Sequence, residues 1–501
     1  MKRDICFIGL DVGTSGLKGL LVDEEGRVIK EAESSYPIYH PEPGWSEQNP
    51  EDWWEAACKV LRMLSNESSY AIRGIGLSGQ MHGSVFLDGW GQPLYPAILW
   101  NDQRTVKECE QIVETTDGRI EEWTCNPPRT AFTLSKILWF RNHKYELYQR
   151  VAKVVLPKDY LRYRLSGAFV TDVTDASGTS LLNVRKRIWS EETLRAFEIP
   201  GEWLCDLVES PEICAQVSAD VARETGVSEG TYIVGGAADQ AAAALGNGVC
   251  SPGVLSITLG TSGVVYVQTD GLVVDPSGAL HSFCHSIPGT FQLMGGVLCA
   301  AGSLEWFRKA IGQKEEGFPE LLALASQVPR GSEGLIFLPY LTGERSPYND
   351  PLARGAWFGL TVRHGKPHLI RALLEGVGFA LYDLVNCVYG LKVPVNRIHV
   401  AGGGAKGDIW TRILSEIIGE KLFLATVKDS SAFGAAMLAA SGVLGVPVKE
   451  LCTRWVKTDQ SVSPEEGAHE TYLRWYEVFT RMYSGTCGFM HQLSRLEGRE
   501  G

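Results

Sequence analysis

Hydrophobic and polar positions near the start of the chain predict a β-hairpin with an unusual turn. Residues 5–10 and 17–22 are mostly apolar, and residues 11–16 between them read Asp-Val-Gly-Thr-Ser-Gly. Two short apolar runs around a Gly-rich turn are typical of a hairpin. The backbone N–H groups of such a turn can surround an anion. Asp11 would repel a bare phosphate, so the pattern favours a phosphate bound with Mg²⁺, with an ordinary polar hairpin as the alternative.

The same pattern recurs near the middle of the chain. Residues 254–259 are mostly apolar, residues 260–263 read Gly-Thr-Ser-Gly, and residues 264–267 are apolar again. Alignment of the glycines places Thr258 opposite Asp11, so one hairpin carries the carboxylate and the other does not. An internal repeat of this kind indicates a duplicated architecture. We therefore predict a nucleotide held in a cleft between two related domains.

Several strand-like runs in the first half end in polar clusters. Residues 72–77 lead into Gly-Gln-Met81-His82-Gly, and residues 97–100 lead into Asn101-Asp102. Residues 232–234 form a third run, which precedes Asp239-Gln240 and a predicted helix of small residues at 241–245. Ligands of open α/β sheets bind where strands end. We expect a binding role for His82, whereas Asp239 could either cap the helix or act in function.

The second half contains a further glycine-rich turn between a predicted strand, 397–401, and a predicted helix, 408–418. Gly402, Gly404 and Gly407 match the dinucleotide-binding pattern G-x-G-x-x-G, with Asp429 downstream. Its late position and the duplicated hairpins argue against a dehydrogenase. The same turn can let an adenosine ring lie against bare backbone. A second helix of small residues, 431–440, is expected to cross the helix at 241–245 at a hinge.

Other elements follow from periodicity and capping. Asn49 and Pro50 are suited to the N-cap and first position of a helix with a buried face. Residues 28–32 and 333–340 read as strands, and residues 368–385 and 466–485 read as helices. Residues 246–253 form a small-residue linker, so we predict domains at 1–249 and 250–501.

Composition describes a globular protein of at least two domains. The chain has 501 residues, a net charge of −12 and 44% hydrophobic residues. No basic run suggests a nucleic-acid surface. No apolar run is long enough to predict a transmembrane helix, and no signal peptide is apparent. The twelve cysteines have no metal-type spacing and are expected to be reduced thiols of a cytoplasmic protein.

Together these motifs resemble the FGGY family of carbohydrate kinases, within the actin/hexokinase/Hsp70 superfamily. The two Gly-Thr-Ser-Gly turns look like its phosphate loops, and residues 402–405 look like its adenosine motif. Residues 133–143 and 355–375 are similar to two family signatures, and residues 79–83, 98–102 and 338–345 are most like members that phosphorylate D-xylulose. The resemblance implies two ribonuclease-H-like α/β domains around a central cleft.

The resemblance also implies an ATP-dependent reaction that makes D-xylulose 5-phosphate. Asp239 would be the catalytic base, and Asp11 would hold Mg²⁺, through water. The sugar would contact Met81, His82, Asn101, Asp102, Asp239 and Gln240. ATP would contact Gly13, Thr14, Ser15, Lys18, Gly260, Thr261, Gly402, Gly403, Gly404 and Ala405.

Three departures from the family pattern and three alternatives accompany this interpretation. Ala237 and Ala238 stand where glycine is common. Gln240 replaces a common Asn after the catalytic Asp, and Gly407 replaces a usual Ser, so Asp408 is expected to take over the helix cap. The alternatives are an FGGY kinase for another pentulose, a sugar acid or a polyol; a weakly catalytic sugar sensor; and a chaperone-like or filament-forming ATPase. Sugar and ATP are the expected partners, with neither nucleic acid nor membrane, and a homodimer is left open.

Overall fold

The computed structural model describes residues 4–66, 70–312, 316–425, 427–458 and 460–496. The first half is built on a seven-stranded sheet with the order β13-β14-β5-β1-β2-β3, and β15 pairs with β5. β1 is antiparallel to β2 and parallel to β5. The predicted first hairpin is confirmed. The strands are β1 (Asp4–Val12), β2 (Gly16–Asp23), β3 (Val28–Ser35), β5 (Tyr70–Gly79), β13 (Ile213–Gln216), β14 (Tyr232–Val234) and β15 (Ala237–Ala238).

The second half repeats this arrangement. Its sheet has the order β18-β19-β17-β16-β22-β23-β24, in which β16 is antiparallel to β17 and parallel to β22. A hairpin thus opens each sheet and a parallel strand continues it, which confirms the duplication and the two-domain α/β fold. The strands are β16 (Val254–Leu259), β17 (Gly263–Thr269), β18 (His281–Cys284), β19 (Phe291–Val297), β22 (Arg397–Ala401), β23 (Leu422–Leu424) and β24 (Gln460–Val462).

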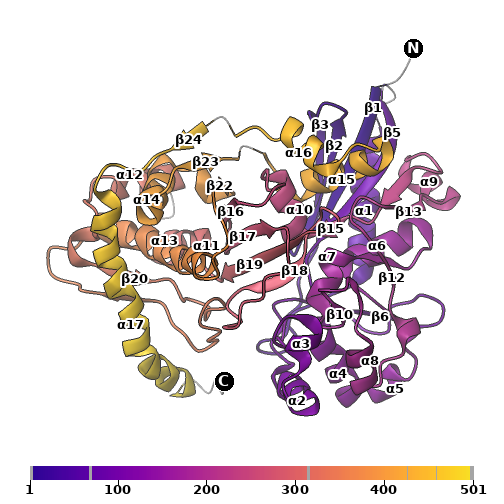
Figure 1. The fold of residues 1–501 in the computed structure, drawn as a ribbon, viewed down its shortest axis with the longest axis horizontal. Helices are drawn as coiled ribbons and strands as arrows, with labels where there is room; N and C mark the ends of the chain where they lie inside the picture. Colours follow the sequence, from indigo (N-terminus) through magenta and orange to yellow (C-terminus); the bar gives the residue numbers. More distant parts are fainter. Residues whose placement is uncertain (1–3, 67–69, 313–315, 426, 459, 497–501) are drawn as a thin grey trace.

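Helices cover both sheets (Figure 1). α1 begins as predicted, since Pro50 is its first residue and the Asn49 side chain accepts a hydrogen bond from the N–H of Glu51. First-half helices are α1 (Pro50–Ser65), α2 (Val106–Thr116), α3 (Ile120–Thr124), α4 (Thr133–His143), α5 (Tyr145–Tyr148), α6 (Pro157–Ser166), α7 (Val173–Ala176), α8 (Glu191–Ala196), α9 (Ala219–Thr225) and α10 (Asp239–Gly246). Second-half helices are α11 (Ala301–Ala310), α12 (Phe318–Ala325), α13 (Lys366–Gly390), α14 (Asp408–Ile418), α15 (Ser430–Leu444), α16 (Val448–Trp455) and α17 (Ala468–Leu496).

Short elements complete the fold. The strand predicted at 333–340 is confined to β20 (Ile336–Leu338), because the 3₁₀ turn η3 (Ser332–Gly334) precedes it. The other short strands are β4 (Glu47–Gln48), β6 (Val85–Leu87), β7 (Ala97–Ile98), β8 (Lys153–Val155), β9 (Val170–Asp172), β10 (Leu182–Asn183), β11 (Ile188–Trp189), β12 (Asp206–Val208) and β21 (Ala356–Phe358). The remaining 3₁₀ turns are η1 (Ser177–Thr179), η2 (Gly201–Trp203) and η4 (Gly403–Lys406).

α15 belongs to the second half of the sequence but packs on the first sheet (Figure 1). Glycines allow the backbones to touch: a Cβ atom on Gly9 would lie 1.8 Å from the carbonyl oxygen of Ala432, and one on Gly76 would lie 1.9 Å from that of Ala435. α15 also crosses α10, where a Cβ on Gly434 would lie 1.9 Å from the oxygen of Ala242. The predicted contact of the two small-residue helices is therefore present. The domain boundary at 249–250 stays a prediction.

α13 is the one helix in the described residues long and apolar enough to cross a membrane. Within its most apolar window, 83% of the residues are buried inside the protein. Its apolar character is therefore explained by its place in the core of the second half. All twelve cysteines are free thiols.

Candidate functional site

Three parallel strand ends bring the first group of predicted residues together. In the register of the first sheet, Asp11 of β1 lies opposite Ser78 of β5, and Ala238 of β15 lies opposite Gly79. Asp239 follows β15 directly, and Met81-His82 follows β5. The sheet therefore carries Asp11, Asp239 and the segment with His82 at one edge, where the Asp11 charge acts on Asp239.

A cavity of about 310 Å³ opens at this point between the two halves. The first half contributes four of the six predicted sugar residues and Thr14 of the first phosphate turn, and the second half contributes part of the second phosphate turn. Its lining residues include Thr14, Met81, His82, Trp100, Asp239, Gln240, Thr261, Ser262, His281 and Arg345. Six of the predicted site residues, from four distant segments, thus face one space, and Asp11 is not among the residues that line it.

Asp239 is the first residue of α10, so Ala238 is the N-cap and Asp239 lies in the first turn. Burial and the nearby Asp11 carboxylate raise the pKa of Asp239 from 3.8 to about 7, while hydrogen bonds from Gln240 and the charge of Arg345 oppose the rise. One carboxylate oxygen accepts the N–H of Gln240 at 2.7 Å. A carboxylate with a pKa near neutrality, facing a cavity, is suited to general base catalysis.

One carboxylate oxygen of Asp11 is available to bind a cation. Burial raises the pKa of Asp11 to about 6, and its Oδ1 atom is buried without a hydrogen-bond partner. The described residues contain no cluster of three or more His, Cys, Asp or Glu side chains that could hold a metal. Mg²⁺ commonly binds through one or two carboxylates together with water and substrate phosphates. A single carboxylate beside a phosphate-type turn fits this mode.

The conformation of His82 determines which ring nitrogen faces the cavity. The residue has φ of 68°, which turns the chain sharply after β5, and the side chain is only 4% exposed. Burial and the charge of Lys136 hold the pKa of His82 well below its usual range, so the ring is neutral. Its Nδ1 lies 2.9 Å from the carbonyl oxygen of Gly178, which can only accept. Nδ1 therefore carries the proton, and Nε2 is left as an acceptor for a substrate hydroxyl.

The two phosphate turns approach the cavity from opposite halves. In the first turn, the N–H of Gly13 donates to the oxygen of Gly16, and the Thr14 hydroxyl lies 3.1 Å from Trp100 Nε1, which donates to it. In the second, the oxygens of Gly260 and Thr261 accept N–H groups at the start of α11. Ser15 is exposed, and so is Lys18, which is ion-paired with Asp429 rather than aimed at the cavity.

The predicted adenosine residues lie beside the second phosphate turn. β22 is parallel to β16, with Ala401 opposite Thr258, so Gly402 emerges beside Leu259, the residue before Gly260. Gly402 has φ of 95°, and a Cβ there would lie 2.6 Å from the carbonyl oxygen of Leu259, so only glycine fits. Gly403 is exposed and has open space around it, Gly404 is buried, and Ala405 is half-buried in η4.

The expectation that Asp408 caps α14 is wrong. Gly407 occupies the N-cap position, and Asp408 is already the first helical residue. Without a side chain at the cap, the negative charge in the first turn is what favours this helix end.

Asn101 and Asp102 do not line the cavity. Asp102 is fully buried and pairs with Arg104 at 2.7 Å, and it accepts the N–H of Ser46 at 2.6 Å. These contacts hold the loop that presents Trp100. Asn101 has a buried Oδ1 without a partner, next in the chain to Trp100.

Arg345 was not singled out from the sequence as a site residue, although it ends the segment 338–345 that carried part of the resemblance. Its guanidinium lines the cavity and lies 5.3 Å from the centre of the Trp100 ring. Among the described residues it forms no salt bridge. The second half therefore supplies a positive charge close to Asp239.

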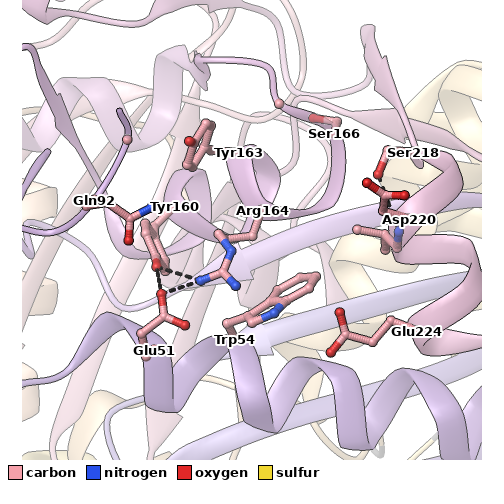
Figure 2. Close-up of a pocket in the computed structure, with 13 residues that line it drawn as sticks. Glu51, Trp54, Gln92, Tyr160, Tyr163, Arg164, Ser166, Ser218, Asp220 and Glu224 are labelled. Atoms are coloured by element: carbon pink, nitrogen blue, oxygen red, sulfur yellow. Dashed lines mark hydrogen bonds and ion pairs between the residues drawn. The ribbon is translucent and has the colours of Figure 1, made fainter. Parts of the chain in front are cut away.

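A second hollow, of about 550 Å³, lies in the first half and includes none of the predicted site residues (Figure 2). Glu51 and Arg164 form an ion pair there, and Tyr160 donates to Glu51 at 2.5 Å. The Arg164 guanidinium also stacks over Trp54, with its carbon 4.7 Å from the ring centre. These charged groups are already paired with one another, so the described residues of this hollow lack the unpaired acid and base groups that line the first cavity.

Comparisons with known proteins agree with this geometry. Residues 6–246 match the N-terminal domain, and residues 255–443 the C-terminal domain, of the FGGY family of carbohydrate kinases. The chain is 38% identical to the xylulose kinase of Escherichia coli K12, over 95% of this chain and 98% of that one. It resembles the crystal structure of a xyloylose kinase from Brucella ovis, with a TM-score of 0.90 and 34% identity over 97% and 100% of the two chains. A gluconate kinase from Lactobacillus acidophilus gives a TM-score of 0.91 at 28% identity, over 98% and 100%. The chain belongs to the FGGY family of carbohydrate kinases.

Proposed function

We propose that the protein transfers the γ-phosphoryl group of ATP to D-xylulose and releases D-xylulose 5-phosphate and ADP. One observation carries the proposal: Asp239, with a pKa of about 7, faces a cavity with the acceptor atom of His82 and both phosphate turns. Similarity to xylulose kinases over nearly the whole chain supports the choice of sugar.

In this mechanism Asp239 accepts the proton of the attacking sugar hydroxyl. The oxygen forms a bond to the γ-phosphorus as the bond from phosphorus to the leaving oxygen of ADP breaks. Most of the catalysis of phosphoryl transfer is positioning and charge stabilisation. Nε2 of His82 would accept a hydrogen bond from another sugar hydroxyl, Met81 would pack against the sugar carbons, and Gln240 would contact the sugar beside the base.

The nucleotide would extend across both halves. Gly13, Thr14, Ser15, Gly260 and Thr261 would hold the phosphates through backbone N–H groups and hydroxyls. The glycine-rich turn at 402–405 would lie against adenosine, and Lys18 would have to leave Asp429 to reach a phosphate. Asp11 would hold Mg²⁺, through water, and the ion would neutralise charge on the phosphates.

A sugar acid is the second candidate substrate. Arg345 favours it, because an unpaired guanidinium in the cavity can bind a carboxylate bidentately. The structural likeness to a gluconate kinase supports the same alternative.

The deciding experiment is a kinase assay that couples ADP release to NADH oxidation across D-xylulose, D-ribulose, glycerol and gluconate. We expect the highest kcat/KM with D-xylulose. A higher value with gluconate would select the second candidate, and ADP release that is independent of any sugar would refute a sugar kinase.

We also propose that the enzyme works in the cytoplasm. The support is that all twelve cysteines are free, as expected for a protein of a reducing compartment. Labelling of all twelve thiols in the freshly purified, denatured protein would test this, and pre-existing disulfides would oppose it.

A further inference from the structure

Residues 172–180, which we call the bracket, contact both sides of the reaction centre. The bracket begins at Asp172, the last residue of β9, and includes α7 and η1. It contacts β15, which leads into Asp239, and it also contacts the ring of His82. None of its residues lines the cavity, so its influence on the site is indirect.

Thr174 holds the peptide group between Ala237 and Ala238, one peptide before Asp239. Its Oγ1 atom accepts the N–H of Ala238 at 2.9 Å, and both residues are fully buried. β15 is only two residues long. After this point, the oxygen of Asp239 accepts a hydrogen bond from Ser431 of α15 at 3.2 Å. Side chains therefore hold the backbone on both sides of this point, with Thr174 bound to Ala238 by the shorter hydrogen bond and Ser431 bound to Asp239 by the longer one.

A buried charge fixes the direction of this hydrogen bond. Because Ala238 N–H can only donate, Thr174 Oγ1 must accept, and its own proton must point elsewhere. Oδ2 of Asp172 receives it at 2.5 Å. Oδ1 of Asp172 pairs at 2.9 Å with Lys158, and all of these side chains are fully buried. Lys158, Asp172, Thr174 and Ala238 thus form one chain of contacts that ends at the residue before the base.

The other end of the bracket fixes His82. The oxygen of Gly178 accepts the proton of His82 Nδ1 at 2.9 Å, which leaves Nε2 free for the substrate. A Cβ atom on Gly178 would lie 2.3 Å from Nδ1, so the histidine ring occupies the space a side chain would need. Between these two contacts, the Ser177 hydroxyl accepts the N–H of Cys284, from β18 of the second half, at 3.0 Å.

We propose that Thr174 is a positioning residue of the kinase, whose hydroxyl sets the place of Asp239 relative to His82 through this bracket. The inference rests on the proposed role of Asp239 as the base. A displacement of about 1 Å in a catalytic group can cost about 100-fold in rate. Loss of the Thr174 hydroxyl leaves the Ala238 N–H unpaired and lets β15 move, whereas the nucleotide turns stay in place.

The test compares Thr174→Val, which keeps the shape and removes the hydroxyl, with Thr174→Ser, which keeps the hydroxyl. We expect Thr174→Val to lower kcat by about 10- to 100-fold, with the KM for ATP within about twofold of wild type. The acidic limb of the pH profile of kcat/KM should move to lower pH, because a loosened carboxylate regains water. Thr174→Ser should restore kcat to within about threefold.

Thr225→Val is the matched control. Thr225 is also fully buried, accepts the N–H of Val227 at 3.3 Å and donates to the oxygen of Val221 at 2.8 Å. It ends α9, whose Asp220 and Glu224 border the second hollow in Figure 2, away from the cavity. This variant should lose stability and keep both kcat and the pH profile.

Several results would overturn the inference. A folded Thr174→Val enzyme with the kcat of wild type would do so, as would an equal loss of kcat in Thr174→Ser or Thr225→Val. If Thr174→Val does not fold, Thr174→Ala takes its place in the same comparison. Asp239→Asn separates the two proposals: an inactive Asp239→Asn with a fully active Thr174→Val refutes only the positioning role, and an active Asp239→Asn refutes the base itself.

Discussion

The Asp239→Asn substitution should remove activity and stabilise the protein at the same time. Asparagine keeps the shape of the protonated acid but cannot accept the proton of the sugar hydroxyl. Loss of a general base typically costs about 10²- to 10⁴-fold in rate. The loss should fall on kcat, with sugar affinity largely kept, because the proton moves only in the transition state.

The gain in stability follows from the raised pKa. The unfolded chain releases the Asp239 proton near pH 4 and the folded protein near pH 7, so between these values folding becomes less favourable as the pH rises. Each tenfold change in the ionisation constant is worth about 1.4 kcal/mol, which gives an upper limit of about 4 kcal/mol above pH 7. Asp239 faces a cavity that water can enter, so we expect about 1–3 kcal/mol. With an unfolding entropy of about 2 cal/mol/K per residue, this raises Tm by about 1–3 °C.

The assay is differential scanning calorimetry of wild type and Asp239→Asn at pH 5 and pH 8, beside coupled kinetics. Asp239→Asn should have a higher Tm than wild type at pH 8, and this difference in Tm should become smaller at pH 5. In the wild type, kcat/KM should be about tenfold lower at pH 6 than at pH 8. Gln240→Glu is a useful comparison, since it adds a carboxylate beside the base and should raise the pKa of Asp239 further. Equal stability of the two proteins at both pH values, or wild-type kcat in Asp239→Asn, would refute this account of the site.

Three further predictions concern the groups around the base. Asp11→Asn should reduce turnover at least 100-fold and raise the Mg²⁺ concentration needed for half-maximal rate. An unchanged dependence of the rate on Mg²⁺ would show that Asp11 has only a structural role. His82→Ala should raise the KM for sugar about tenfold or more while sparing the KM for ATP, and a rise confined to ATP would reverse the assignment of the two subsites. Arg345→Met should lower kcat at least tenfold with D-xylulose, whereas an effect on gluconate alone would place the guanidinium in sugar-acid recognition.

Local sequence patterns were sufficient for the strand ends of the first half. The turn after β1 and the polar residues after β5 are adjacent in sequence to the strands that carry them. Parallel pairing of β1 and β5 then carries both turns to the same edge of the sheet, with Asp11 opposite Ser78. Repetition of the hairpin at 254–267 likewise predicted the second sheet before its other strands could be recognised.

Contacts between distant backbones could not be predicted in this way. The packing of α15 on the first sheet depends on Gly9 and Gly76, because a side chain at either position would clash with the backbone of the helix. The helix lies more than 300 residues after these glycines in the sequence. Arg345 lines the cavity from a loop of the second half, and although it ends the segment 338–345 that carried part of the resemblance, its local pattern does not predict a place beside Asp239. The resemblance implied a sugar contact for Asp102, and its ion pair with Arg104 in the buried interior could not be read from the local pattern.

The asymmetry of the two phosphate turns has an electrostatic reason. Asp11 already raises the pKa of Asp239, so a second carboxylate at the equivalent position in the other turn would add to that repulsion and to the repulsion of the phosphates. Thr258 occupies that position, opposite Ala401 of β22, and carries no charge. Arg345, also from the second half, adds a positive charge that lowers the pKa of Asp239. In our proposal the first half thus supplies the base and the ligand for Mg²⁺, while the second half balances their negative charge. The duplicated fold can then surround a polyphosphate and still keep one carboxylate near neutrality, as general base catalysis requires.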